Sequence, residues 1–205
     1  MKKYLIPLKL LELLNIEHFN FNCNKIINLD HKFTNLPKIK SLSFIGCNIK
    51  HIANDVFSQL YQLESLNLAV NELDSLDFIE NNQFTNLLEL KLNSNQIKIL
   101  SENQFSNLTN LLELDLSSNP ITEIHNYTFK NLFNLNIINF RHINNIKIHE
   151  YAFTDLHSLD TIHHKKLSKQ LNAYRGFKDL ITRLIKLYDK NKNITIANEL
   201  DDKYE

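Results

Sequence analysis

The chain offers few side chains in arrangements that support catalysis or cofactor binding. Two of its nine histidines, His163 and His164, are adjacent and are the first candidates for metal ligands. Adjacent residues of an extended segment face opposite sides, so this pair is not expected to hold one ion. Serine, histidine and aspartate occur without a motif that joins them into a catalytic triad, and two glycines cannot build a glycine-rich phosphate loop. The sequence therefore predicts no enzyme, no catalytic residue, no metal ligand and no cofactor.

The composition of the chain reduces the number of protein classes to which it can belong. The chain has 205 residues and 43% hydrophobic content, which is enough to bury a continuous core, and its net charge of zero provides no field that would steer it toward nucleic acid. No segment is long and apolar enough to span a membrane, and two cysteines are too few for a disulfide framework. Acceptor sequences for glycosylation occur at Asn107, Asn126 and Asn193. Chance alone gives about as many in so asparagine-rich a chain, so they do not decide the compartment.

The apolar residues repeat along the chain in phase. Six units each contain two apolar residues that flank a single residue, as Leu114 and Leu116 do, and the position three residues past this pair is often asparagine. These positions, Asn24, Cys47, Asn71, Asn95, Asn119 and Ile143, are 23, 24, 24, 24 and 24 residues apart. Most units then place a phenylalanine nine or ten residues later, at Phe33, Phe57, Phe105, Phe129 and Phe153. The unit at 72–89 departs from the pattern, and a seventh unit around Ile162 is degenerate.

The repeated motif L-x-x-L-x-L-x-x-N-x-I-x-x-I, with a downstream F-x-x-L-x-x-L, resembles the leucine-rich repeat. It is similar to the class of this repeat that is common in animal extracellular and cell-surface proteins, such as Toll-type receptor ectodomains. The resemblance covers roughly residues 10–167. It implies an α/β solenoid shaped as an arc or horseshoe, with short parallel strands on the concave face and irregular or short helical segments on the convex face. It also implies a non-catalytic protein–protein interaction module.

Each repeat is then one coil, and it cannot bury its apolar face unless neighbouring coils stack on it. Buried backbone groups at the turn that leaves each strand need partners, and a carboxamide supplies both a donor and an acceptor. We therefore predict a structural column made of Asn24, Asn71, Asn95 and Asn119, and we attribute most other asparagines to composition. Cys47 takes an asparagine position one coil after Cys23, and the sequence leaves open whether these two cysteines form a disulfide.

Residues between the inward-pointing leucines are expected to face outward on the concave side. Glu89, Glu113 and Asp115 give this face an acidic middle, and basic side chains follow in the next coils. A rigid, extended surface of graded charge suits a protein partner better than a small substrate, although the aromatic residues that commonly anchor interfaces are missing from it. The candidate partner-binding residues are Glu89, Lys91, Asn93, Glu113, Asp115, Ser117, Asn139, Arg141, His163 and Lys165.

After Lys166 the apolar spacing changes to three and four, which is typical of an amphipathic helix. We expect residues 168–190 to form a helix that caps a solenoid spanning 1–167, followed by a polar, frayed tail over 191–205. The opposite face of this helix is basic, with Lys178, Arg183 and Lys186. The alternative is that this face binds an anionic membrane or an acidic partner while the repeats act as a carrier.

The first residues leave the compartment open. Lys2 and Lys3 precede an apolar stretch, as in a signal peptide, but Lys9 and Glu12 interrupt it and no small-residue cleavage site follows. Taken alone, the chain is expected in the cytoplasm unless it is a fragment of a longer protein. The family resemblance implies an extracellular or cell-surface location instead.

Overall fold

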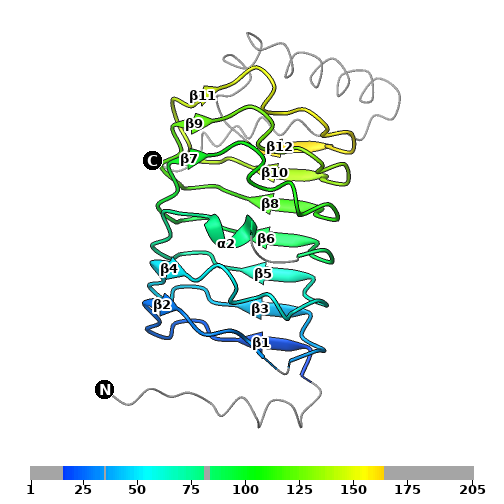
Figure 1. The fold of residues 1–205 in the computed structure, drawn as a ribbon. Helices are drawn as coiled ribbons and strands as arrows, with labels where there is room; N and C mark the ends of the chain where they lie inside the picture. Colours follow the sequence, from blue (N-terminus) through cyan, green and yellow to red (C-terminus); the bar gives the residue numbers. More distant parts are fainter. Residues whose placement is uncertain (1–15, 35, 81–83, 164–205) are drawn as a thin grey trace, which may run out of the picture.

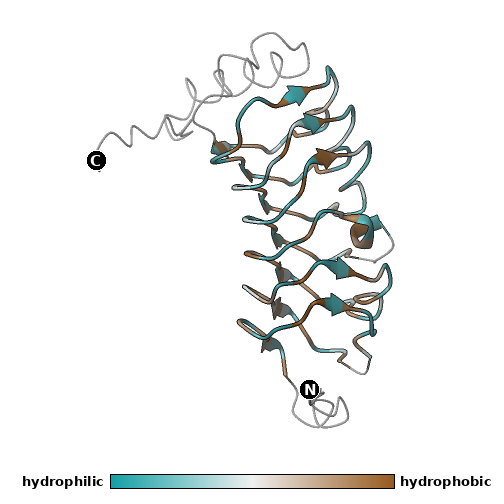
Figure 2. Cartoon of the chain, turned by 90° about the vertical axis from the view of Figure 1, so that its left-hand side faces the viewer, coloured by the Kyte–Doolittle hydropathy of each residue, from teal (hydrophilic) through white to brown (hydrophobic). Residues whose placement is uncertain are grey.

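A computed structural model describes residues 16–34, 36–80 and 84–163 as a column of stacked coils (Figure 1). Each coil contributes one short strand to a seven-stranded parallel sheet with the order β1-β3-β5-β6-β8-β10-β12. These strands are β1 (His18–Asn20), β3 (Ser41–Ser43), β5 (Ser65–Asn67), β6 (Glu89–Lys91), β8 (Glu113–Asp115), β10 (Ile137–Asn139) and β12 (Thr161–His163). The column curves so that this sheet lines its concave side (Figure 2). The predicted solenoid is confirmed.

The middle residue of each strand explains why the coils stack in register. Leu66, Leu90 and Leu114 are paired in succession across β5, β6 and β8, and none exposes more than 1% of its surface. Strand side chains alternate between the two faces, so a slip of one residue would expose this entire apolar row. The repeat in the sequence therefore fixes the pairing of the strands.

In the described part of the chain, five strands of two residues, one from each of five coils, lie on the side opposite the concave sheet (Figure 1). They are β2 (Asn28–Leu29), β4 (His51–Ile52), β7 (Ile99–Leu100), β9 (Glu123–Ile124) and β11 (Lys147–Ile148). β2 pairs with β4, and β9 pairs with both β7 and β11, all in parallel. Ile124 and its equivalents, Leu29, Ile52, Leu100 and Ile148, lie in these small sheets and are buried.

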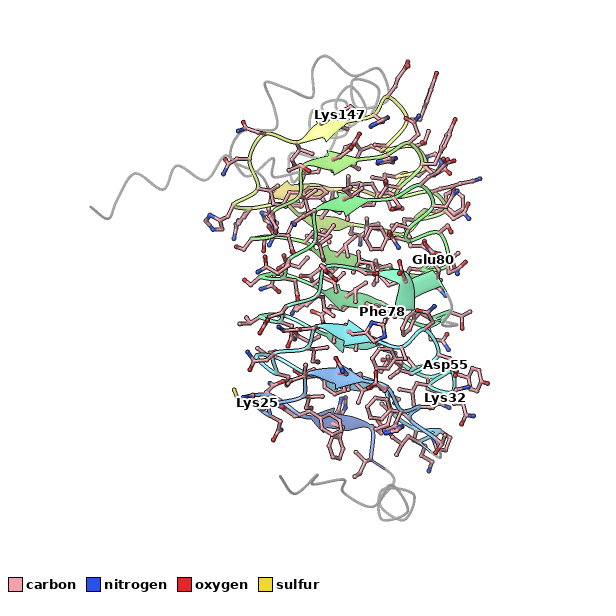
Figure 3. The ribbon with its side chains drawn as sticks, turned by 60° about the vertical axis from the view of Figure 1, so that its left-hand side comes forward. Lys25, Lys32, Asp55, Phe78, Glu80 and Lys147 are labelled. Carbon is pink, nitrogen blue, oxygen red and sulfur yellow. The ribbon has the colours of Figure 1, made fainter. Side chains whose placement is uncertain are left out.

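The unit at 72–89, whose sequence departs from the repeat, interrupts this second row of strands. It forms the helix α2 (Asp77–Glu80) between β4 and β7, and the Asp77 amide donates to Ser75 Oγ at 3.1 Å, as at a helix N-cap. Phe78 on this helix is 2% exposed and packs edge-on against Phe57, with ring centroids 6.1 Å apart (Figure 3). A phenylalanine from the helix thus fills core space beside a coil that lacks the phenylalanine of the repeat.

The turn after each of the first six concave strands contains a residue in the left-handed region. φ is 59° at Cys23, 66° at Gly46, 58° at Val70, 58° at Ser94, 54° at Ser118 and 61° at His142. Glycine adopts this conformation without a steric penalty, whereas Val70, which is branched at Cβ, is strained. In each of these turns the left-handed residue immediately precedes the asparagine position of the repeat. The column of asparagines therefore follows directly on these turns.

Several predictions fall outside the described residues. The capping helix over 168–190, the tail over 191–205 and Lys165 all lie in 164–205, so the proposed division of the chain stays a prediction. Within the described part of the chain, no helix has the length and apolar character needed to cross a membrane. Cys23 is exposed and Cys47 is buried, and both are free thiols.

Candidate functional site

The outward-facing side chains of β3, β5, β6, β8 and β10 are half-buried, and several of them are held by neighbours in adjacent coils. Glu89 in β6 accepts a hydrogen bond from Ser65 Oγ of β5 at 2.7 Å and is bridged by Lys91 Nζ at 2.6 Å. Burial raises the pKa of Glu89, but the hydrogen bonds from Lys91 and Ser65 outweigh it, and the net pKa is lowered. The hydrogen bond to Glu89 raises the pKa of Lys91. This pair is therefore a fixed, charged element of the surface.

Both carboxylate oxygens of Asp115 in β8 accept hydrogen bonds from the chain. Its Oδ1 accepts the Ser117 amide at 2.9 Å and the Ser117 hydroxyl at 2.6 Å, and its Oδ2 accepts Asn139 Nδ2 at 3.1 Å. Asn139 Oδ1 in turn accepts the Arg141 amide at 3.1 Å. These hydrogen bonds satisfy polar groups at the ends of β8 and β10. They involve three of the predicted partner-binding residues, Asp115, Ser117 and Asn139, which also line the concave face.

Glu113 differs from its acidic neighbours. It lies at the centre of the concave face, one coil from Glu89, with which it is paired across β6 and β8. Among the described residues its carboxylate accepts no hydrogen bond and forms no ion pair, although it acts through space to raise the pKa of Lys91. Glu113 is therefore the acidic group on this face that is most available to a partner.

The basic end of the face is only partly described. Arg141 Nη2 donates toward His163 Nδ1 at 3.4 Å, which brings two of the predicted residues together. Asn93 is half-buried at the end of β6, and Lys165 lies outside the described residues. The structure thus places the predicted acidic middle and the first part of the predicted basic end on one continuous sheet.

The asparagine column lies behind this face, in the core. Asn95 is 2% exposed; its Nδ2 donates to the carbonyl oxygens of Leu68 and Leu92 at 2.9 and 3.0 Å, and its Oδ1 accepts the Leu73 amide at 3.0 Å. Asn71 and Asn119 make the equivalent bonds in neighbouring coils. Asn24, in the first described coil, is exposed and bonds within its own turn, to the Phe21 carbonyl at 2.6 Å.

Replacing Asn95 by alanine is expected to lower the free energy of unfolding by about 1–3 kcal/mol, because buried carbonyl and amide groups of two coils lose their partner. Urea denaturation followed by circular dichroism measures the change. The matched control is Asn144→Ala, since Asn144 is exposed and its side chain makes no hydrogen bond within the described part of the chain. The control should change stability by less than about 0.5 kcal/mol, and an equally small cost at Asn95 would contradict the structural role of the column.

Asparagines outside the column are also in phase, contrary to the expectation that composition explains them. Asn86, Asn110 and Asn134 donate to the carbonyl oxygens of Tyr61, Thr85 and Thr109 in the preceding coils. Asn107 and Asn131 form a further series, bonded to the Glu80 and Ser106 carbonyls. Part of the high asparagine content is therefore a structural feature of the solenoid, because each of these side chains ties one coil to the next.

Sequence reasoning missed a cluster of charged side chains on the convex side. Glu123 in β9 is bonded to Lys147 Nζ of β11 at 2.6 Å and to His149 Nε2 at 2.8 Å, and His125 Nε2 lies 3.9 Å from its other oxygen. The hydrogen bond from Lys147, followed by that from His149, lowers the pKa of Glu123 to about 2. The signal was present in the sequence, because His125 and His149, like Glu123 and Lys147, are one repeat apart.

Replacing Glu123 by glutamine is expected to remove a pH-dependent contribution to stability. The pKa of this carboxyl is lowered from 4.5 to about 2 in the folded chain. The folded state therefore binds the proton less tightly than the unfolded state, so the contribution is complete above pH 4.5 and disappears as the pH falls toward 2. The contribution is small because the ion pairs of Glu123 lie at the surface, where solvent screens them.

Thermal melting of the wild type and Glu123→Gln across this pH range measures the effect, with Glu102→Gln, at an exposed loop position, as the control. The melting temperatures of wild type and Glu123→Gln should differ most above pH 4.5 and converge toward pH 2. A difference that stays constant over the range would contradict the assignment.

Comparisons with known proteins agree with this geometry. A family model described as the BspA type leucine-rich repeat region matches residues 77–199 in six copies. No curated protein matches the sequence. Matching solved structures include the Drosophila Toll–Spatzle complex in its glycosylated form, with a TM-score of 0.63 and 22% identity over 72% of this chain. They also include the TLR13–ssRNA13 complex, with a TM-score of 0.54 and 21% identity over 73% of this chain.

These structural similarities cover only a small part of the two neighbouring proteins. The matched regions make up 20% and 25% of the Toll–Spatzle and TLR13 chains, so this chain spans a quarter or less of these two neighbours. At identities of 22% and 21% the similarity shows a shared fold and nothing about shared partners.

Proposed function

The chain belongs to the BspA-type leucine-rich repeat family, and on that premise we propose that it is a non-catalytic module that binds a protein through its concave strand face. Repeat solenoids present extended concave surfaces that serve as binding platforms. The two structural neighbours were both solved in complexes with another macromolecule, Spatzle or ssRNA13. The net charge of zero favours a protein over a nucleic acid as the partner here.

The observation that carries the proposal is the fixed arrangement of charge on this face. Ser65 and Lys91 hold Glu89, and Asn139 holds Asp115, each through a contact within or between coils. Side chains that are ordered before binding lose little conformational entropy when a partner docks, which favours affinity. Glu113, at the centre of this group, is available for a basic side chain of the partner. The proposal is thus a partner with a basic patch opposite β6 and β8.

The test is capture of binding proteins on the immobilised full chain, with quantitative mass spectrometry of what is retained. Glu113→Arg reverses the charge at the centre of the concave face. Glu102→Arg makes the same change at an exposed loop position away from the face and serves as the matched control. We expect a partner that is retained by the wild type and by the control and is lost from Glu113→Arg.

Reversing an interfacial charge creates like-charge contacts that cost several kcal/mol in a specific complex, so the loss should be nearly complete. Proteins that are retained equally by all three chains would contradict binding through the concave face. Retention that is abolished by nuclease treatment would instead identify a nucleic-acid partner and overturn the proposal.

A further inference from the structure

We propose that Glu123, His125 and His149 form a binding site for a divalent transition-metal ion, with Zn²⁺ as the representative ion. One ligand atom from each residue lies within 4.8 Å of the other two. Two imidazoles and one carboxylate form a donor set that suits Zn²⁺, Ni²⁺ or Cu²⁺, whereas Ca²⁺ and Mg²⁺ prefer oxygen ligands only. The site is separate from the concave face and does not depend on the function proposed for that face.

The distances between the donor atoms are close to those that a metal ion requires. Zn²⁺ binds nitrogen and oxygen at about 2.0–2.2 Å in tetrahedral geometry, which places neighbouring ligand atoms about 3.4 Å apart. His149 Nε2 lies 2.8 Å from Glu123 Oε1 and His125 Nε2 lies 3.9 Å from Glu123 Oε2, on either side of that value. Small side-chain rotations are therefore enough to bring all three donors onto one ion, without a change in the backbone.

The solenoid holds the three residues in place. β9 pairs with β11 in the register Glu123↔Lys147 and Ile124↔Ile148, so the two histidines follow equivalent positions of adjacent coils. The amides of His125 and His149 donate to the Leu100 and Ile124 carbonyls, both at 2.9 Å, which continues the ladder to this point. The two imidazole rings stack with centroids 4.9 Å apart and planes 15° from parallel. The ladder fixes the spacing of the ligands before any ion binds.

Lys147 supplies the cation that a metal ion would displace. Its ammonium group lies 2.6 Å from Glu123 Oε1, and its side chain is 66% exposed, so it can move into solvent when an ion takes its place (Figure 3). The ligand side chains are 26–40% exposed, which gives an ion direct access from solvent. Three protein ligands leave a fourth position for water or for a donor atom of another molecule.

The experiment is isothermal titration calorimetry of the full chain with ZnCl2 at about pH 7.5, where protons compete little for the imidazoles. The wild type is expected to bind one Zn²⁺ at this site. His125→Gln, His149→Gln and Glu123→Gln should each weaken binding by at least about tenfold, the smallest loss typical of removing even an outer partner of a metal ligand. Lys147→Gln should bind Zn²⁺ more tightly, because the competing ammonium is gone.

The matched control is His51→Gln. His51 is an exposed histidine in β4, at the place that Glu123 occupies three coils later. This variant should bind Zn²⁺ as the wild type does, and circular dichroism of each variant checks that it is folded. The absence of saturable binding in the wild type, or unchanged binding by His125→Gln and His149→Gln, would overturn the proposal. Weaker binding by Lys147→Gln would overturn the proposed geometry as well, since it would show that Lys147 does not compete with the ion.

Discussion

Replacing Leu114 by aspartate is expected to unfold the described solenoid. Leu114 is the middle residue of β8, is fully buried and is paired with Leu90 and Ile138 in the adjacent strands. The substitution loses about 2–5 kcal/mol of apolar packing and adds a desolvation penalty of several kcal/mol for an unpaired charge. This sum is comparable to the total stability of a typical domain, about 5–15 kcal/mol. Thermal melting by circular dichroism should show no cooperative transition.

The control for this experiment is the same substitution two residues earlier. Leu112 is 39% exposed, so aspartate at this position stays in contact with water and should change the melting temperature by only a few degrees. Both variants introduce the same aspartate, so a difference between their melting curves reports the burial of the replaced leucine and not the chemistry of the new side chain. A cooperative, wild-type melting curve for Leu114→Asp would contradict the assignment of this residue to the interior of a coil.

Replacing Phe129 by alanine is expected to be the second most damaging change, at about 3–5 kcal/mol. The Phe129 ring is fully buried between Phe105 and Phe153, with centroid distances of 5.7 and 5.3 Å, and it meets Phe140 edge-on. Removing it opens a cavity between Phe105 and Phe153 and breaks both stacking contacts, each worth about 0.5–1.5 kcal/mol beyond the buried area. Urea denaturation should show a lower midpoint.

Phe133→Ala provides the comparison on the same stretch of chain. Phe133 is 44% exposed and stacks on His157 at the surface, so its removal leaves no enclosed cavity. Its loss should cost about 1 kcal/mol or less. Equal costs at the two positions would contradict the continuous aromatic core of the solenoid.

The parallel strands of the concave sheet could be predicted because the apolar positions recur at a constant spacing along the sequence. An inward leucine at the same place in each unit dictates a parallel strand, because only stacking of the coils buries all of them. The small strands of the convex side could not be predicted in this way. β9 and β11 are two residues long, too short to show alternation, and they form only because the concave strands bring Glu123 and Lys147 beside each other.

The candidate site could also be predicted only in part, because its contacts join different coils. Alternation correctly indicated that Asp115 and Asn139 face outward, but their hydrogen bonds to the chain and to each other depend on distances between coils. The cluster around Glu123 escaped detection for the same reason. A search for motifs along the chain compares near neighbours, whereas residues one repeat apart, such as His125 and His149, are neighbours in a solenoid. Comparing residues one period apart would find such clusters.

Hydrogen–deuterium exchange of the full chain, with and without the protein retained in the capture experiment, tests the central claim most directly. Binding through the concave face predicts slower exchange in the segments 89–93, 113–117 and 137–141, which contain β6, β8 and β10. The convex segments 99–104 and 123–127 should exchange as in the free chain. Slower exchange that is confined to the convex segments, or to residues 168–190, would contradict the account.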